Sequence, residues 1–271
     1  MKKILLIINL LFSFTLSFSA KGQESAFSSG EHLVYGVDYK IGFNVEVATL
    51  SMHIIPERFY GTDHFKITAS AQVRSSFKWF YDLNHKYEVW IDSLSMRPSY
   101  FQSDLKEENY RFKSSYRYEW DSLKVTTWAR NYNRGSSETK IMELTDNSYD
   151  AISLFYQLRG IDVDTLDYNT PYALDVVFDD NIRRVYYRYM GKKKISVRKI
   201  GDFNTIKIVC TLATSDGKPY DDGNEFEVYL SDDQNKIPVF MYTPIKVGSV
   251  NVWLKYYDGL KYPLTSLVKA K

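Results

Sequence analysis

The chain has 271 residues, of which 44% are hydrophobic and 25% are charged, a balance typical of a folded globular protein and not of a disordered one. Its formal net charge is only +2, so the global charge gives no indication of nucleic-acid binding. Aromatic residues make up 16% of the chain, with 23 tyrosines, and tyrosine suits the half-buried faces of β-strands.

The N-terminal segment has the features of a secretory signal peptide. Two lysines precede an apolar run, and the small residues Ala20 and Gly22 fit cleavage before Gln23. We expect residues 1–22 to be the signal peptide and residues 23–271 to be a single all-β domain, periplasmic or secreted. Cleavage after Ala20 is one alternative. An uncleaved membrane anchor is the other, disfavoured because the run is short against the ~20 residues that span a bilayer.

The chain has one cysteine, Cys210, within the alternating apolar run IKIVCTLA. A single cysteine excludes an intrachain disulfide and a cysteine-rich metal site. Because it lies far from the expected cleavage site, it also argues against a lipoprotein. We expect Cys210 to be a buried strand residue, and we expect no transmembrane segment in the mature chain.

Apolar residues alternate with period two along most of the chain after residue 30, which predicts β-strands. The apolar positions change from odd to even numbers across Gly42, which predicts a bulge or bend in one long, curved strand pair. Further strands of the first half are predicted around residues 65–73, 87–91, 110–120 and 123–127.

One central segment, DNSYDAISLFYQLRG, has its apolar residues at helical spacing. Asn147 or Ser148 is the predicted N-cap, and Gly160 follows the last turn. The strands expected after this helix cover residues 172–178, 182–190, 194–199, 203–214, 226–231 and 239–257. The predicted fold class is therefore mainly β: a curved antiparallel sheet forming a half-open barrel or sandwich, with one short central helix.

A weak internal repeat flanks this helix. FKITASA, EVWID and Pro98 in the first half are echoed by IKIVCTLA, EVYLS and Pro238 in the second. For each half, this pattern predicts two strands, a polar turn and a third strand that begins near a proline. Duplication and the common chemistry of hairpins both explain the similarity.

The opening GEHLVYGVDYKIGFNVEVATLSM resembles the start of exported bacterial proteins of the family named domain of unknown function 3108 (DUF3108). The segments SYDAISLFYQLR, VYLSDDQNKIPVFM and KVGSVNVWL fit the same family. The resemblance implies no established activity. The strand pattern of the family is similar to that of the periplasmic Lol-type lipoprotein carriers, which implies a half-open β-barrel with an apolar concave face closed by helices. Such a similarity of architecture is only an analogy for function.

The sequence carries no recognisable catalytic motif. The four histidines lie in the first third without metal-ligand spacing, although His64 and His85 could approach one another across strands. No nucleophile elbow, zincin motif or phosphate-binding glycine loop occurs. Acidic pairs such as Asp179–Asp180 and Asp221–Asp222 suit turns better than calcium loops. We therefore expect no enzyme, no metal and no cofactor.

Residues 183–199 hold eight basic residues and no acidic one. On a strand, Arg184 and Arg188 project to one side and Val185 to the other. Export argues against nucleic acid as the partner, so these arginines are candidates for binding an anionic lipid head group or a polysaccharide. The alternative is a solvated strand face and a lysine-rich turn that protect a sheet edge.

Aromatic residues supply the other candidate ligand contacts. Trp79, Phe80 and Tyr81 are consecutive, which suits the rim of a cavity or a barrel mouth better than one buried face. Three tryptophans on predicted strands are expected to line the interior: Trp90, Trp120 and Trp128. The alternative is core filling, because a large curved sheet needs bulky side chains.

These features predict a non-catalytic periplasmic binding or carrier protein for a lipid-like or other hydrophobic small molecule, held by burial of apolar surface. The alternative is a structural or interaction protein of the cell envelope with a filled core, whose sheet edges and exposed aromatic residues contact an envelope protein. A hydrolase of envelope polymers is the third hypothesis.

Overall fold

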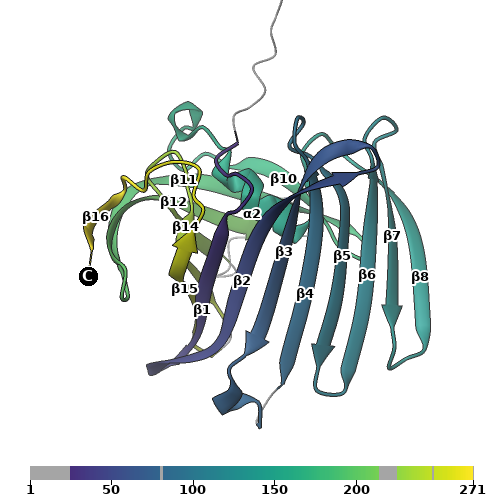
Figure 1. Ribbon diagram of the computed structural model, residues 1–271, viewed down its shortest axis with the longest axis horizontal. Helices are drawn as coiled ribbons and strands as arrows, with labels where there is room; N and C mark the ends of the chain where they lie inside the picture. Colours follow the sequence, from purple (N-terminus) through teal and green to yellow (C-terminus); the bar gives the residue numbers. More distant parts are fainter. Residues whose placement is uncertain (1–24, 80–81, 214–224, 246, 271) are drawn as a thin grey trace, which may run out of the picture.

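One continuous β-sheet forms most of the protein (Figure 1). The computed structural model describes residues 25–79, 82–213, 225–245 and 247–270, so the expected signal peptide lies outside the described residues. The strands are β1 (His32–Ile41), β2 (Phe43–Phe59), β3 (Thr62–Val73), β4 (Leu83–Asp92), β5 (Pro98–Glu107), β6 (Tyr110–Glu119), β7 (Lys124–Asn131), β8 (Ser136–Glu143), β9 (Ser148–Tyr149), β10 (Tyr172–Val177), β11 (Ile182–Val197), β12 (Gly201–Leu212), β13 (Phe226–Ser231), β14 (Pro238–Pro244), β15 (Ser249–Asp258) and β16 (Leu267–Ala270).

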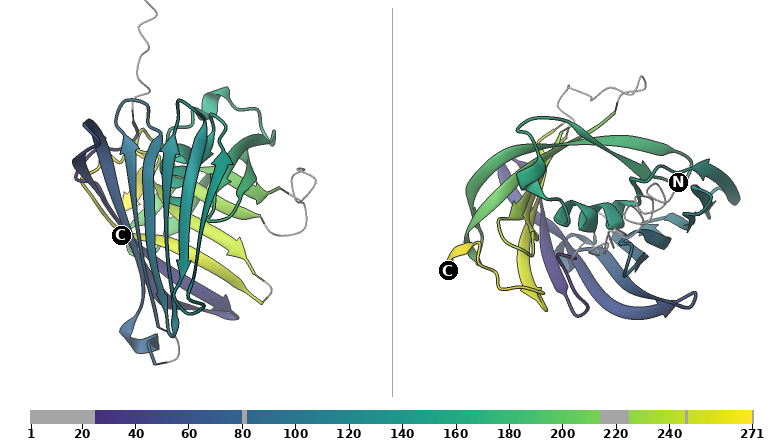
Figure 2. Two further views of the ribbon diagram at one scale, coloured as in Figure 1. Left: turned by 90° about the vertical axis from the view of Figure 1, so that its right-hand side faces the viewer. Right: turned by 90° about the horizontal axis from the view of Figure 1, so that it is seen from above.

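The strand order explains why the sheet curves without closing. Hydrogen-bonded neighbours follow the path β8-β7-β6-β5-β4-β3-β2-β1-β15-β14-β13-β12-β11-β10-β9, and β16 pairs with β12. The end strands β8 and β9 do not pair with one another, and the sheet stays open along that side. Seen from above, it wraps around the helix α2 (Ala151–Arg159) (Figure 2). The predicted fold class is confirmed.

Gly42 lies at the tip of a hairpin between β1 and β2, and it adopts a positive φ of 72°. The predicted bulge or bend of the long strand pair is therefore not at Gly42, and the register of this pair shifts between Val37 and Asp38 instead. Antiparallel pairing explains the change from odd to even apolar positions, because Leu33 lies opposite Met52 and Tyr35 opposite Leu50. These partners share one face of the sheet.

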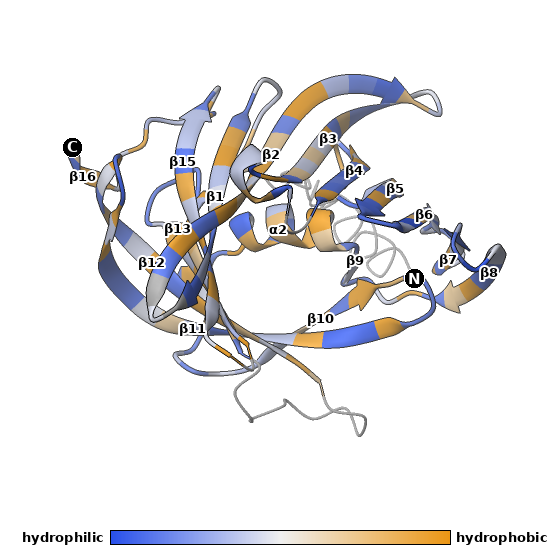
Figure 3. Cartoon of the chain, turned by 90° about the horizontal axis from the view of Figure 1, so that it is seen from below, coloured by the Kyte–Doolittle hydropathy of each residue, from blue (hydrophilic) through white to orange (hydrophobic). Residues whose placement is uncertain are grey.

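That inner face carries the main core. Leu33, Tyr35, Ile54, Ile67 and Val89 are completely buried. Figure 3 shows α2 enclosed by the curved, open sheet, and hydrophobic and hydrophilic residues alternate along the strands of that sheet. Alternation of this kind buries one face and leaves the other in water.

The helix α2 begins two residues later than Ser148, the later of the two predicted caps, would place it. Asp150 is the N-cap: its carboxylate accepts hydrogen bonds from the backbone N–H groups of Ile152 and Ser153, and the Ser153 side chain completes a capping box. Asn147 and Ser148 are wrong as caps because Ser148–Tyr149 form β9, which pairs in parallel with β10. No helix in the described part of the chain is long and apolar enough to cross a membrane.

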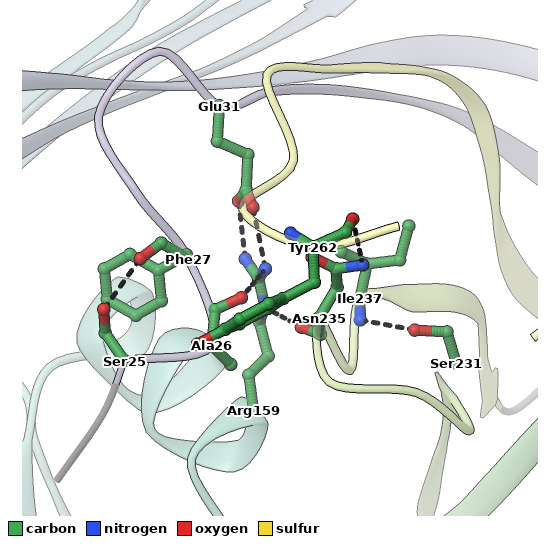
Figure 4. A network of polar contacts seen from close by, with 9 residues as sticks. All are labelled: Ser25, Ala26, Phe27, Glu31, Arg159, Ser231, Asn235, Ile237 and Tyr262. Atoms are coloured by element: carbon green, nitrogen blue, oxygen red, sulfur yellow. Dashed lines mark hydrogen bonds and ion pairs between the residues drawn. The ribbon is translucent and has the colours of Figure 1, made fainter. Parts of the chain in front are cut away.

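Arg159, in the last turn of α2, is completely buried and anchors the helix (Figure 4). Its guanidinium forms a two-pronged ion pair with Glu31, at N–O distances of 2.5 and 2.7 Å. Arg159 Nε also donates to the Asn235 carbonyl at 3.0 Å, and Nη2 donates to the Ala26 carbonyl at 3.1 Å. These contacts tie α2 to the N-terminal segment and to the β13–β14 turn. Burial alone would lower the pKa of Arg159, but the Glu31 carboxylate outweighs burial and raises it.

Some strand boundaries differ from the sequence prediction for identifiable reasons. β11 runs without a break through the lysine-rich segment, because Gly191, at a φ of 84°, absorbs a bulge between Tyr189 and Lys192. The predicted strand over residues 239–257 is the hairpin β14–β15. β8 was not predicted because its mostly polar residues lie at an exposed sheet edge. Asp179–Asp180 lies in the β10–β11 turn, as predicted.

Candidate apolar ligand groove

An apolar groove lies between α2 and the second half of the sheet. Its volume is about 490 Å³, within the roughly 300–1,000 Å³ typical of small-molecule sites. Its walls come from α2, from β10 to β14 and from the residue that follows β10.

The helix contributes four residues to the groove at helical spacing: Ala151, Leu154, Phe155 and Leu158. Residues three, four and seven positions apart lie on one face of a helix, so a single stripe of α2 faces the groove. The other side of the helix packs against β4 and the N-terminal segment, where the Tyr156 ring lies 4.8 Å from the Phe27 ring between centroids. Phe155, at the border of the stripe, also contacts Tyr35 of the first half of the sheet, at 6.2 Å between centroids.

The strands contribute residues from alternating positions. Val185 on β11 lies opposite Leu212 on β12, and Val228 on β13 lies opposite Met241 on β14. All four line the groove, together with Val176 on β10. Side chains at matching positions of neighbouring strands share a face, and this register builds one continuous apolar wall.

The groove offers apolar contact and almost nothing else. Thr243 supplies the only side-chain hydroxyl among the lining residues. Phe178 and Leu212 are 36% and 37% exposed, so part of the apolar lining reaches solvent. An occupant would gain roughly 25 cal/mol for each Å² of apolar surface removed from water.

Cys210 belongs to the same buried cluster as the groove-lining residues Val185, Val228 and Leu154. Burial raises the pKa of the Cys210 thiol to about 12. The thiol is therefore protonated and unreactive in the folded protein, as expected for a structural cysteine.

The two arginines predicted to bind an anionic group do not line the groove. Arg184 pairs with Asp175 at 3.0 Å, and Arg188 pairs with Glu225. Val185, between them, points into the groove, so Arg184 projects from the opposite face of β11. The predicted division between arginines and Val185 is present, but these arginines are already engaged by carboxylates.

Trp79, the first of the three consecutive aromatic residues, does not line the groove. Trp79 is 84% exposed, and its indole N–H donates to the Ser76 carbonyl at 3.0 Å. Phe80 and Tyr81 lie outside the described residues.

The three strand tryptophans also lie away from the groove. Trp90 is on the outer face of β4, where it stacks on Phe59 at 5.0 Å between centroids and donates to the Glu57 carboxylate at 2.8 Å. Trp120 follows β6, and its indole N–H donates to the Pro98 carbonyl at 2.8 Å. Trp128 lies on the outer face of β7. Trp90 and Trp128 therefore do not line the interior, because their strand positions alternate with the inward residues Val89 and Thr127.

The predicted approach of His64 and His85 across strands does not occur, whereas His32 on β1 lies opposite His53 on β2, at 5.7 Å between ring centroids. His64 lies opposite Asp92, and its Nε2 is 2.8 Å from Ser99 Oγ. His85 points to the inner face, and its Nε2 lies 2.8 Å from Glu107 Oε1. Among residues 25–79, 82–213, 225–245 and 247–270, no group of three or more His, Cys, Asp or Glu side chains is arranged to hold a metal ion.

The residues that line the groove belong to patterns visible in the sequence, but the sequence-based prediction placed ligand contacts at the tryptophans instead. The helical spacing of Leu154, Phe155 and Leu158 predicted an amphipathic helix but not which sheet half each side would face. The alternating apolar positions of β11 and β13 predicted buried strand faces. A groove forms only where the helix and the strands are too far apart for their apolar side chains to fill the space between them. The distance between helix and strands is set by the tertiary structure and not by either local pattern.

The curved open sheet, the enclosed helix and the groove beside it define a β-barrel-like protein. A solved structure with this architecture is the crystal structure of a beta-barrel-like protein of domain of unknown function DUF1849 from Brucella abortus. The similarity has a TM-score of 0.56 and covers 86% of this chain and 99% of that chain, and at 10% sequence identity it shows the fold alone.

Residues 34–255 match the family described as "Protein of unknown function (DUF3108)". The match covers most of the chain, so the protein belongs to the DUF3108 family, and the resemblance inferred from its sequence is confirmed. A search of curated proteins finds no match. The similarity to Lol-type carriers stays a prediction.

Proposed function

We propose that the protein is an exported, non-catalytic carrier that holds a lipid-like molecule in the groove between α2 and the second half of the sheet. The observation that carries this proposal is the apolar cavity of about 490 Å³. A core filled for purely structural reasons would be expected to close such a space, because protein interiors are densely packed.

The lining chemistry favours a single apolar chain as the occupant. With one threonine hydroxyl and no charged side chain among the lining residues, the groove gives a polar head group little to bind. The head group would remain in solvent beyond the partly exposed Phe178 and Leu212. A fatty acyl chain meets these requirements, since each buried methylene contributes about 0.8 kcal/mol.

Export rests on the N-terminal segment, whose lysines, apolar run and small residues are typical of a signal peptide. In the periplasm or outside the cell, a groove of this kind would shield one lipid chain from water.

The proposal is tested by titrating the mature protein with an environment-sensitive apolar dye, in competition with a saturated fatty acid. Ala151→Trp places an indole at the start of α2, where the alanine is exposed and lines the groove. We expect this variant to weaken dye binding at least about tenfold, equivalent to about 1.4 kcal/mol. Leu212→Asp, which puts a charge on the exposed wall, should act in the same direction.

Two matched variants control for unspecific effects. Ala173→Trp adds the same indole at an exposed position of β10 whose side chain points away from Val176 and the groove. Leu94→Asp adds the same charge in the β4–β5 turn, at a leucine that is 85% exposed. Both should bind dye as the unaltered protein does. Absence of dye binding by the unaltered protein, or equal losses in the groove and control variants, would contradict the proposal.

A further inference from the structure

A second hollow lies on the opposite face of the sheet, over strands β3 to β7. Its volume is about 640 Å³. Residues of its lining, such as Thr68 and Ser70, alternate along β3 with Ile67 and Ala69, which are completely buried in the core. The hollow is therefore on the outer face and is separated from the apolar groove by the sheet itself.

One row of outward-facing residues crosses the hollow. The strand register places these residues side by side on five neighbouring strands: Thr68, Glu88, Gln102, Ser115 and Trp128. Thr68 and Ser115 are short, whereas Trp128, opposite Ser115, and Tyr100, two residues before Gln102 on β5, are large and half-buried. Short side chains in the row leave the depression, and the aromatic rings form part of its wall.

The polar groups of the hollow are held in place and nearly balanced in charge. Glu88 accepts a hydrogen bond from Gln102 Nε2 and lies 3.2 Å from Lys66 Nζ. Asp104 lies 3.0 Å from Lys113 Nζ. Lys86 is a further exposed cation of the lining. The hollow thus presents fixed donors and acceptors without a strong field of one sign, which suits an uncharged, hydroxyl-rich ligand.

We propose that this hollow binds a segment of a neutral polysaccharide. A sugar ring has hydroxyl groups at its rim and a C–H face that packs on the negative face of an aromatic ring. Trp128 and Tyr100 supply such rings, and Gln102, Glu88 and Lys86 supply hydrogen-bonding groups. The proposal is independent of the carrier function, because the two cavities lie on opposite faces.

A protein partner fits the hollow less well. The centre of a protein–protein interface is depleted in charged residues and is largely apolar. Here charged and amide side chains occupy the centre of the row, at Glu88 and Gln102, and the aromatic residues stand at its margin.

The test is a titration of the mature protein with three uncharged sugars, cellotriose, maltotriose and N,N′,N″-triacetylchitotriose, observed by saturation-transfer NMR. We expect at least one of them to bind with a dissociation constant of about 1 mM or tighter. Trp128→Ala should weaken that binding at least about tenfold. Ser115→Tyr, which keeps every native aromatic ring and fills the floor with a strand-compatible residue, should also abolish it.

Two controls make the result specific. Trp79→Ala removes a tryptophan that is 84% exposed and outside the hollow, and Ala151→Trp alters only the apolar groove. Both should bind the sugar as the unaltered protein does. The proposal is overturned if none of the three sugars binds at about 10 mM, or if binding persists unchanged in both Trp128→Ala and Ser115→Tyr.

Discussion

The two halves of the sheet contain the same hairpin, built around a lysine between a glutamate and an aromatic ring. In the first half, Lys66 on β3 lies opposite Trp90 on β4, with its Nζ 4.6 Å from the ring centroid and 3.2 Å from the Glu88 carboxylate. The register of β4 with β5 then shifts, so that Ile91 lies opposite Pro98.

The second half repeats this arrangement in β12 to β14. Lys207 lies opposite Tyr229, with its Nζ 5.7 Å from the ring centroid and 2.7 Å from the Glu227 carboxylate. The register shifts again beyond the aromatic residue, and Leu230 lies opposite Pro238. The weak sequence repeat therefore corresponds to a repeat of pairing, contacts and bulge position.

The halves differ in what covers their inner faces. α2 packs directly against β4, whereas the groove of about 490 Å³ separates it from β13 and β14. Local sequence thus builds the same hairpin twice, and the position of one helix decides which copy faces a cavity.

The largest expected effect comes from breaking the attachment of α2 to the second hairpin. Arg159→Met leaves the Glu31 carboxylate buried without its partner, and we expect a loss of about 3–5 kcal/mol in the free energy of unfolding. The double variant Glu31→Leu with Arg159→Met should recover much of the loss, since no unpaired charge remains. Urea unfolding monitored by circular dichroism measures both. If the loss in the double variant equalled the sum of the losses in Glu31→Leu and Arg159→Met, the two side chains would not stabilise the protein as a pair.

A matched pair of valines compares the two inner faces. Val89 and Val228 occupy equivalent positions in the EVWID and EVYLS segments, and they are 0% and 3% exposed. Val89→Ala opens a new cavity in a packed core and should cost about 2 kcal/mol. Val228→Ala should cost about 1 kcal/mol less, because Val228 already borders an open groove. Equal losses in urea unfolding would mean that the groove is packed as tightly as the first half.

The two lysines should behave alike if the hairpins are equivalent. Lys66→Met removes partly exposed ion pairs with Glu57 and Glu88, and Lys207→Met removes one with Glu227. Each variant also removes one ring contact, at lysines whose side chains are 19% and 23% exposed. Each should lower the free energy of unfolding by about 1 kcal/mol or less relative to the unaltered protein. Added salt should reduce this loss, because it screens the ion pairs. A large loss at only one of the two positions would break the comparison.

The smallest effect concerns acid pH in the second hairpin. Burial alone would raise the pKa of Glu227, but hydrogen bonds from Lys207 and Tyr229, together with the charge of Lys207, outweigh burial and lower it below its ordinary value of 4.5. A carboxyl with a lowered folded-state pKa stabilises the protein above its unfolded-state pKa, and this contribution is lost as pH falls through the folded-state value. The stability advantage of the unaltered protein over Glu227→Gln should therefore shrink below about pH 4.5. An advantage independent of pH would exclude this linkage.

The sequence predicted the sheet and the helix because their periodicities are local properties. It predicted that Arg184 would project opposite Val185 for the same reason. It did not predict β8, whose edge position requires no apolar alternation, or the outward orientation of Trp128, which depends on strand phase. The groove depends on the position of α2, which is fixed by the ion pair of Arg159 with Glu31. These two residues are far apart in the sequence, so no local pattern predicts how far α2 lies from the sheet.

The central claim is that the groove beside the second hairpin holds an apolar ligand. The most direct measurement is native mass spectrometry of the protein purified without detergent from its own cells, followed by solvent extraction. The account predicts one lipid-like adduct per chain in the unaltered protein and in Ala173→Trp, and none in Ala151→Trp. An adduct-free unaltered protein that also fails to take up a fatty acid, or an adduct that persists in Ala151→Trp, would contradict it.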